Sequence, residues 1–114
     1  MISAMTLEDF QRFIDEQDEL LRVKKGADYG ERERVFARTI KLGEEYGELC
    51  DAVLASVGDQ RKGKLKKQTH LDLRDEFADV FIVTFLLAKV MNVDIMQALD
   101  HKVRKIREKH NKQL

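Results

Sequence analysis

The chain has 114 residues with 21 basic and 21 acidic side chains, so its formal net charge is zero. This length suits one domain with its own core, and a balanced charge gives no general reason to expect nucleic-acid or membrane binding. The single Cys50 excludes an intrachain disulfide and a cysteine-rich zinc site. Because the first residues do not resemble a signal peptide and no apolar run reaches about 20 residues, we expect a cytoplasmic protein outside the membrane.

Four helices are expected in chain order, since proline is absent and only six glycines occur. The first runs from about Leu7 to Lys24, with Thr6 as N-cap and Asp9 at the capping-box position. The second runs from about Arg32 to Val57, and its apolar residues recur at helical spacing. We place the centre of its buried stripe at Leu42, Leu49 and Val53, with Glu45 on the stripe's edge and Glu48 further round the same edge.

A basic loop at 61–67 follows, which we interpret as solvated rather than as a nucleic-acid site because it lacks interleaved aromatic residues. The third helix runs from about Leu71 to Met91, and Asn92 suits the left-handed residue after it. Asp94 caps the last helix, which extends from about Ile95 to Lys109. The expected fold is therefore all-α, a four-helix-type bundle in a single domain over residues 1–114.

The third helix is apolar on nearly all sides, since only Thr84 and Lys89 interrupt its apolar residues between Val80 and Met91. Such a helix is normally buried on all sides. A four-helix monomer of this size has difficulty covering it, so we expect a homodimer or homotetramer.

Two acidic clusters lie inside this helical sequence, Glu44–Glu48 on the second helix and Glu76–Asp79 on the third. Each holds carboxylates three residues apart, which share one helix face and repel each other. If the two helices pair antiparallel, Glu45, Glu48, Glu76 and Asp79 face one another and suit a hard divalent cation. The alternative that the residues alone leave open is a solvated acidic face, supported at Glu45 by Lys41 four residues before it.

A resemblance to a known family favours the metal site over the solvated face. The segment from Lys41 to Leu49 (KLGEEYGEL) and the segment from Asp75 to Phe81 (DEFADVF) resemble the two motifs of MazG-like nucleoside triphosphate pyrophosphohydrolases, a group of all-α enzymes. The resemblance covers about residues 36–107. It implies cleavage between the α- and β-phosphates, which releases a nucleoside monophosphate and pyrophosphate.

The resemblance also implies roles for particular residues. Glu45, Glu48, Glu76 and Asp79 would hold Mg2+, with Mn2+ as an alternative ion, and Glu44 would orient or deprotonate the attacking water. Lys41, Lys102 and Lys105 would bind substrate phosphates. Asp100 stands where many relatives have asparagine, so the remaining phosphate and sugar contacts do not carry over. Two alternatives to the triphosphatase remain: a phosphoribosyl-nucleotide pyrophosphohydrolase, and a non-catalytic helical oligomer that binds nucleotide or metal.

Overall fold

A computed structural model describes residues 4–25, 30–58 and 70–113, and these residues form four helices and no strand. The helices are α1 (Leu7–Lys25), α2 (Glu31–Ser56), α4 (His70–Val90) and α5 (Ile95–Gln113). Each begins and ends within a few residues of its predicted bounds, so the all-α prediction is confirmed. The predicted basic loop at 61–67 lies outside the described residues.

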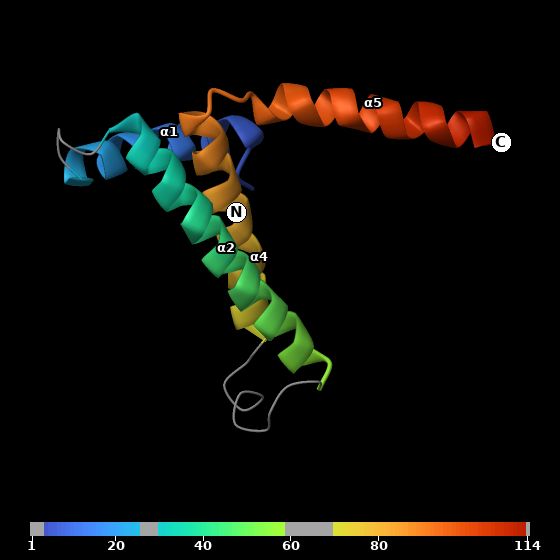
Figure 1. The fold of residues 1–114 in the computed structure, drawn as a ribbon. Coiled ribbons are helices and arrows are strands. Elements are labelled where there is room, and N and C mark those ends of the chain that lie inside the picture. Colours follow the sequence, from blue (N-terminus) through green and yellow to red (C-terminus); the bar gives the residue numbers. More distant parts are fainter. Residues whose placement is uncertain (1–3, 26–29, 59–69, 114) are drawn as a thin grey trace.

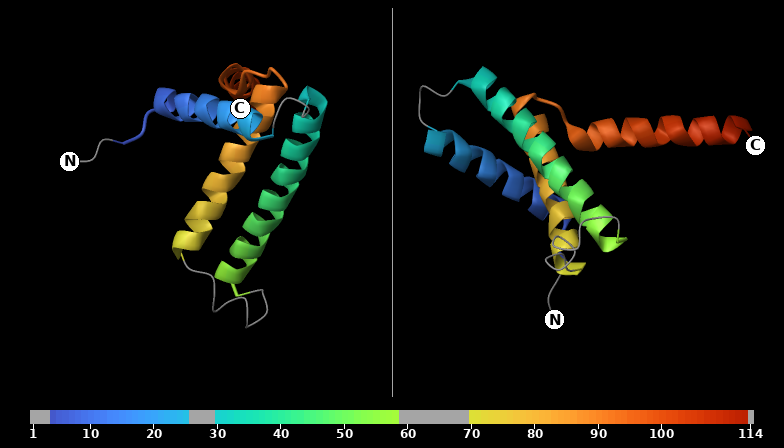
Figure 2. Two further views of the ribbon diagram at one scale, coloured as in Figure 1. Left: turned by 90° about the vertical axis from the view of Figure 1, so that its left-hand side faces the viewer. Right: turned by 60° about the horizontal axis from the view of Figure 1, so that its bottom comes forward.

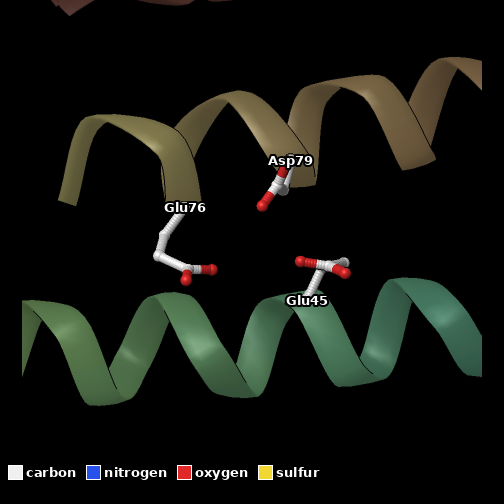
Figure 3. A group of neighbouring side chains, drawn as sticks. All are labelled: Glu45, Glu76 and Asp79. Carbon is white, nitrogen blue, oxygen red and sulfur yellow. The ribbon is translucent and has the colours of Figure 1, made fainter. Parts of the chain in front are cut away.

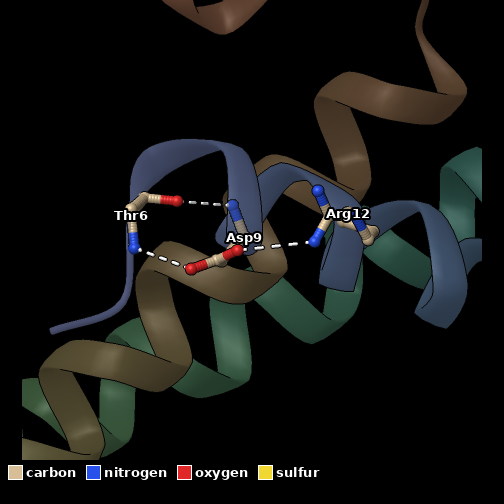
Figure 4. A network of polar contacts seen from close by, with 3 residues as sticks. All are labelled: Thr6, Asp9 and Arg12. Atoms are coloured by element: carbon tan, nitrogen blue, oxygen red, sulfur yellow. Dashed lines mark hydrogen bonds and ion pairs between the residues drawn. The ribbon is translucent and has the colours of Figure 1, made fainter. Parts of the chain in front are cut away.

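The predicted helix ends are confirmed by local contacts. At the start of α1 the Asp9 backbone N–H donates to Thr6 Oγ1 (3.1 Å), and the Thr6 N–H donates to Asp9 Oδ2 (3.0 Å) (Figure 4). Arg12 adds an ion pair to the same carboxylate. The backbone hydrogen bond from Thr6 is the main reason that the pKa of Asp9 is lowered.

The turn between α4 and α5 also follows the sequence prediction. Asn92 has a φ of 56°, the left-handed conformation that asparagine tolerates better than most residues. Asp94 Oδ1 then accepts a hydrogen bond from the Gln97 N–H at 3.1 Å, which caps α5. These two residues end one helix and start the next without proline or glycine.

The helices α2 and α4 lie side by side and run antiparallel, and α1 crosses against α4 (Figures 1 and 2). Phe10 of α1 packs edge-to-face on Phe85 of α4, with ring centroids 4.8 Å apart. The small core between these three helices has six buried apolar residues among those described: Ile14, Ala52, Ala55, Val83, Leu86 and Val90. None of the described helices is both long and apolar enough to cross a membrane.

Much apolar surface is left uncovered in the single chain. Phe77 and Phe81 of α4 are 50% and 62% exposed, although the sequence predicts a helix buried on all sides. The helix α5 extends away from the α2–α4 pair, and its apolar residues Leu99, Val103 and Ile106 are exposed. A bundle in which all four helices pack together therefore does not form within one chain, because α5 points outward. The predicted assembly with further copies stays a prediction.

Candidate metal centre

Three carboxylates meet between α2 and α4, where the sequence places its two acidic clusters. Glu45 comes from α2 and is 6% exposed, whereas Glu76 and Asp79 come from α4 and are half-buried. One oxygen from each side chain lies within 4.8 Å of the other two. Figure 3 shows the three side chains pointing toward one another across the space between the helices. The antiparallel pairing makes this possible, since the chain returns along α4 opposite the acidic segment of α2.

The electrostatics of this cluster are unfavourable without a cation. Burial, reinforced by the charges of Glu48, Asp79 and Glu45, raises the pKa of Glu76. Burial also raises the pKa of Asp79, with help from Glu45 and Asp75. In addition, Glu45 Oε2 and Glu76 Oε2 are buried with no hydrogen-bond partner in the described part of the chain. Buried carboxylates of this kind are normally paired or coordinate a metal, and an all-oxygen donor set suits Mg2+ or Mn2+.

Glu48 lies at the edge of this cluster. It is exposed, and it is outside the group of three whose oxygens approach within 4.8 Å. Its charge is nevertheless the second cause of the raised pKa of Glu76, after burial. The structure thus brings together three of the four predicted ligands closely and places the fourth beside one of them.

Lys41 and Glu44 lie on α2 next to the cluster. Lys41 Nζ is 3.1 Å from Glu45 Oε1 and 3.7 Å from Glu44 Oε2. The hydrogen bond and the charge of Glu45 raise the pKa of Lys41. Glu44 is exposed, as the sequence predicts. Lys41 therefore partly neutralises Glu45, while Glu76 and Asp79 have no cation of comparable proximity in the described residues.

Lys102 and Lys105 lie on α5 and are exposed. Because α5 extends away from the α2–α4 pair, a single chain does not bring these two predicted phosphate ligands to the carboxylates (Figure 1). Among the predicted phosphate-binding lysines, Lys41 alone lies at the cluster.

The predicted centre of the buried stripe of α2 is wrong. The buried residues of this helix are Arg38, Glu45, Ala52 and Ala55, whereas Val53 is 37% exposed. Glu45 therefore lies in the middle of the face toward α4, not at its edge. The search for apolar periodicity centred the stripe on Leu42, Leu49 and Val53, because Arg38 and Glu45 are polar and take no part in an apolar pattern. Leu42 and Leu49 are half-buried beside the observed centre.

The sequence analysis also missed a buried ion pair between α1 and α2. Arg38 Nη1 forms an ion pair with Asp18 Oδ1 at 2.8 Å and donates a hydrogen bond to the Leu86 carbonyl at 2.8 Å. Arg22 Nε approaches the other Asp18 oxygen at 3.2 Å from the solvent side. One signal was available: Arg38 lies seven residues before Glu45, which places both on one helix face. Nothing in the sequence indicates that Asp18 faces them.

The raised pKa of Glu76 predicts how a Glu76→Gln variant depends on pH when chelator removes all metal. Ionising Glu76 costs free energy in the folded protein, because its folded pKa lies above the usual 4.5. The ionised Glu76 carboxylate therefore lowers the free energy of unfolding by the whole of this cost above the raised pKa, and this effect is absent below pH 4.5. We expect Glu76→Gln to be more stable than the parent at neutral pH, by an amount that shrinks on acidification. Denaturant unfolding at several pH values measures this, and a difference that grows toward acid would contradict it.

Fold and site together define an all-α protein with an acidic cluster between two antiparallel helices. A family model described as the MazG nucleotide pyrophosphohydrolase domain matches residues 36–114, well over half of the chain. The chain belongs to this family, which confirms the resemblance seen in its two motifs. No match was found among curated proteins or among solved structures.

Proposed function

We propose that this protein hydrolyses nucleoside triphosphates to nucleoside monophosphate and pyrophosphate, in a reaction that depends on Mg2+. The observation that carries the proposal is the group of three carboxylates from facing helices, with two buried oxygens that lack partners among the described residues. Membership of the MazG nucleotide pyrophosphohydrolase family supports a nucleotide substrate. A role in cleansing the nucleotide pool is consistent with this reaction.

The proposed roles follow from the positions of the side chains. Glu45, Glu76 and Asp79 would hold the ion, with Glu48 at the rim of the cluster adding its negative charge. Bound there, Mg2+ or Mn2+ supplies charge neutralisation and lowers the pKa of a coordinated water. The positive charge of Lys41 lies beside Glu45, at 3.1 Å, and would also attract a substrate phosphate oxygen bound at the cluster.

Glu44 is the proposed base for the attacking water. Its side chain is exposed and paired only loosely with Lys41, at 3.7 Å, so it can reach a water at the edge of the cluster. In the reaction the water oxygen forms a bond to the α-phosphorus, and the bond from that phosphorus to the bridging oxygen breaks. The proton passes to Glu44, and pyrophosphate leaves with the bridging oxygen.

We propose that Lys102 and Lys105 of a second copy of the chain bind the substrate phosphates. Their helix extends outward with an exposed apolar face, and Phe77 and Phe81 of α4 are also uncovered. A homodimer or homotetramer would cover such surfaces and bring basic residues of α5 toward the acidic cluster of another copy. Light scattering that finds a single copy would contradict this part.

The reaction is tested by pyrophosphate release from a panel of canonical and modified nucleoside triphosphates, with Mg2+, with Mn2+ and with chelator. With Mg2+ or Mn2+ present, we expect monophosphate and pyrophosphate in equal amounts. Chelator should abolish the formation of both products. Turnover of a phosphoribosyl-nucleotide alone would favour the narrower metabolic enzyme. Thermal stabilisation by Mg2+ without turnover of any substrate would overturn the reaction and favour a non-catalytic nucleotide- or metal-binding module.

A further inference from the structure

Almost the whole of α5 is uncovered within one chain. Its first two residues are half-buried, whereas every residue from Gln97 to Asn111 is exposed (Figure 2). Leu99, Val103 and Ile106 recur at intervals of four and three residues, which places them on one face of the helix. Most of the stability of a helix in a protein comes from packing such a face against another surface. We therefore looked for a surface that the apolar face of α5 fits.

A large apolar groove of about 640 Å3 lies between α1 and α4. Four phenylalanines line it, Phe10 and Phe13 from α1 and Phe77 and Phe81 from α4. Phe77 and Phe81 are exposed in the single chain, and contiguous exposed apolar side chains mark an interaction site. Because Phe77 directly follows Glu76, the groove starts at the same end of α4 as the acidic cluster.

The charges around this groove favour α5 as the helix that occupies it. The helix α1, which forms one wall, has six acidic residues and one basic residue between Leu7 and Leu20. Asp9 and Glu16 lie four residues before and three residues after Phe13, so they share its helix face. The helix α5 has six basic residues and two acidic ones. The cavity of about 340 Å3 between α1, α2 and α4, in contrast, is lined by three basic residues of α2 and would repel α5.

We propose that the groove between α1 and α4 receives α5 of a second copy of this chain, which accepts α5 of the first copy in return. The α5 helix of the same chain does not fill the groove, because it extends away from the α2–α4 pair (Figure 1). Leu99, Val103 and Ile106 pack on the phenylalanines, and the basic side chains of α5 approach the acidic side chains of α1. A reciprocal exchange has two-fold symmetry and covers both apolar surfaces at once. This inference rests on the assembly in the proposed function, whose contacting surfaces it names, and not on the reaction.

Cross-linking of two differently tagged chains tests which surfaces meet. Cys50→Ser first removes the natural thiol from both chains. One chain then carries Phe81→Cys and the other carries Val103→Cys, and a short bismaleimide is added after the copies have exchanged. We expect mass spectrometry to find the two different chains joined through these thiols. The matched control replaces Val103→Cys by Leu54→Cys on α2, since Leu54 and Val103 are 41% and 40% exposed. It should give background levels of the mixed product.

Sedimentation velocity measures the contribution of each surface to the affinity between copies. Phe81→Asp and Val103→Asp each place a charge in the proposed apolar contact. Each should raise the dissociation constant of the assembly about tenfold or more, whereas Leu54→Asp should leave it unchanged. All three side chains are at least 40% exposed in the single chain, so the variants should fold with the helical content of the parent. Circular dichroism checks this.

Three outcomes would overturn the assignment of the groove. They are a parent that sediments as a single chain, mixed cross-links no more abundant than with Leu54→Cys, and equal weakening by all three aspartate variants. The expected cross-links in a protein that hydrolyses no triphosphate would support the groove and overturn the proposed reaction. Triphosphate turnover by a parent that sediments as a single chain would support the reaction and overturn the groove.

Discussion

Replacing Glu45 by glutamine is expected to abolish stabilisation by Mg2+ and to reduce turnover by at least about 100-fold, comparable with removing one preorganised electrostatic contact from an active site. Glu45 is the most buried of the three carboxylates, and its Oε2 has no partner in the described part of the protein. Glutamine preserves the shape of the side chain but removes the charge that would bind the ion. Thermal unfolding with and without Mg2+, together with initial rates of pyrophosphate release, measures both effects.

The matched control is Glu31→Gln, the same chemical change on an exposed residue in the first turn of the same helix. It alters the net charge of the chain equally, but it lies almost four helical turns from Glu45. We expect normal turnover and an unchanged Mg2+ response. If Glu45→Gln keeps the full thermal shift with Mg2+, the ion binds elsewhere and the carboxylate cluster is not the metal centre.

Replacing Arg38 alone by methionine should destabilise the protein strongly, by about 3–5 kcal/mol, because Asp18 is left as a buried charge without its main partner. Asp18 is 5% exposed, and Arg22 reaches it only from the solvent side at 3.2 Å. A loss of this size is a large part of the stability of a small domain. Denaturant unfolding curves measure it.

The double variant Asp18→Asn, Arg38→Met should recover most of that loss in stability, since it leaves no unpaired buried charge. Arg22→Met serves as the control and should cost about 1 kcal/mol or less, because its guanidinium is half in solvent. Equal losses for Arg22→Met and Arg38→Met would show that the buried contact to Asp18 adds nothing beyond a surface ion pair.

The helix ends of this protein could be predicted because their causes are local in the chain. Thr6 and Asp9 satisfy each other's backbone N–H groups across three residues, and Asp94 does the same for Gln97. The left-handed conformation of Asn92 depends on the preference of that one residue. Contacts of this range depend on nothing beyond the neighbouring side chains, so a pattern of residues is sufficient to predict them.

The acidic cluster could be predicted in outline for a related reason. Carboxylates three residues apart share a face whatever the helix packs against, and the antiparallel return of α4 brings Glu76 and Asp79 opposite Glu45. The burial of each side chain could not be predicted from the sequence pattern, because burial depends on the angle at which the two helices pack. Glu45 is central and Glu48 is at the rim, whereas periodicity alone placed both on an edge.

The sequence by itself therefore determined the helices, their caps and the pairing of the two acidic segments, all of which depend on spacing along the chain. The tertiary structure alone decided that Asp18 meets Arg38 across 20 residues, that Arg38 also binds the Leu86 carbonyl, and that α5 extends outward. Each of these depends on how separate helices are oriented in space. That orientation arises from packing and from the cost of burying charges without partners, and periodicity within one helix carries no information about it.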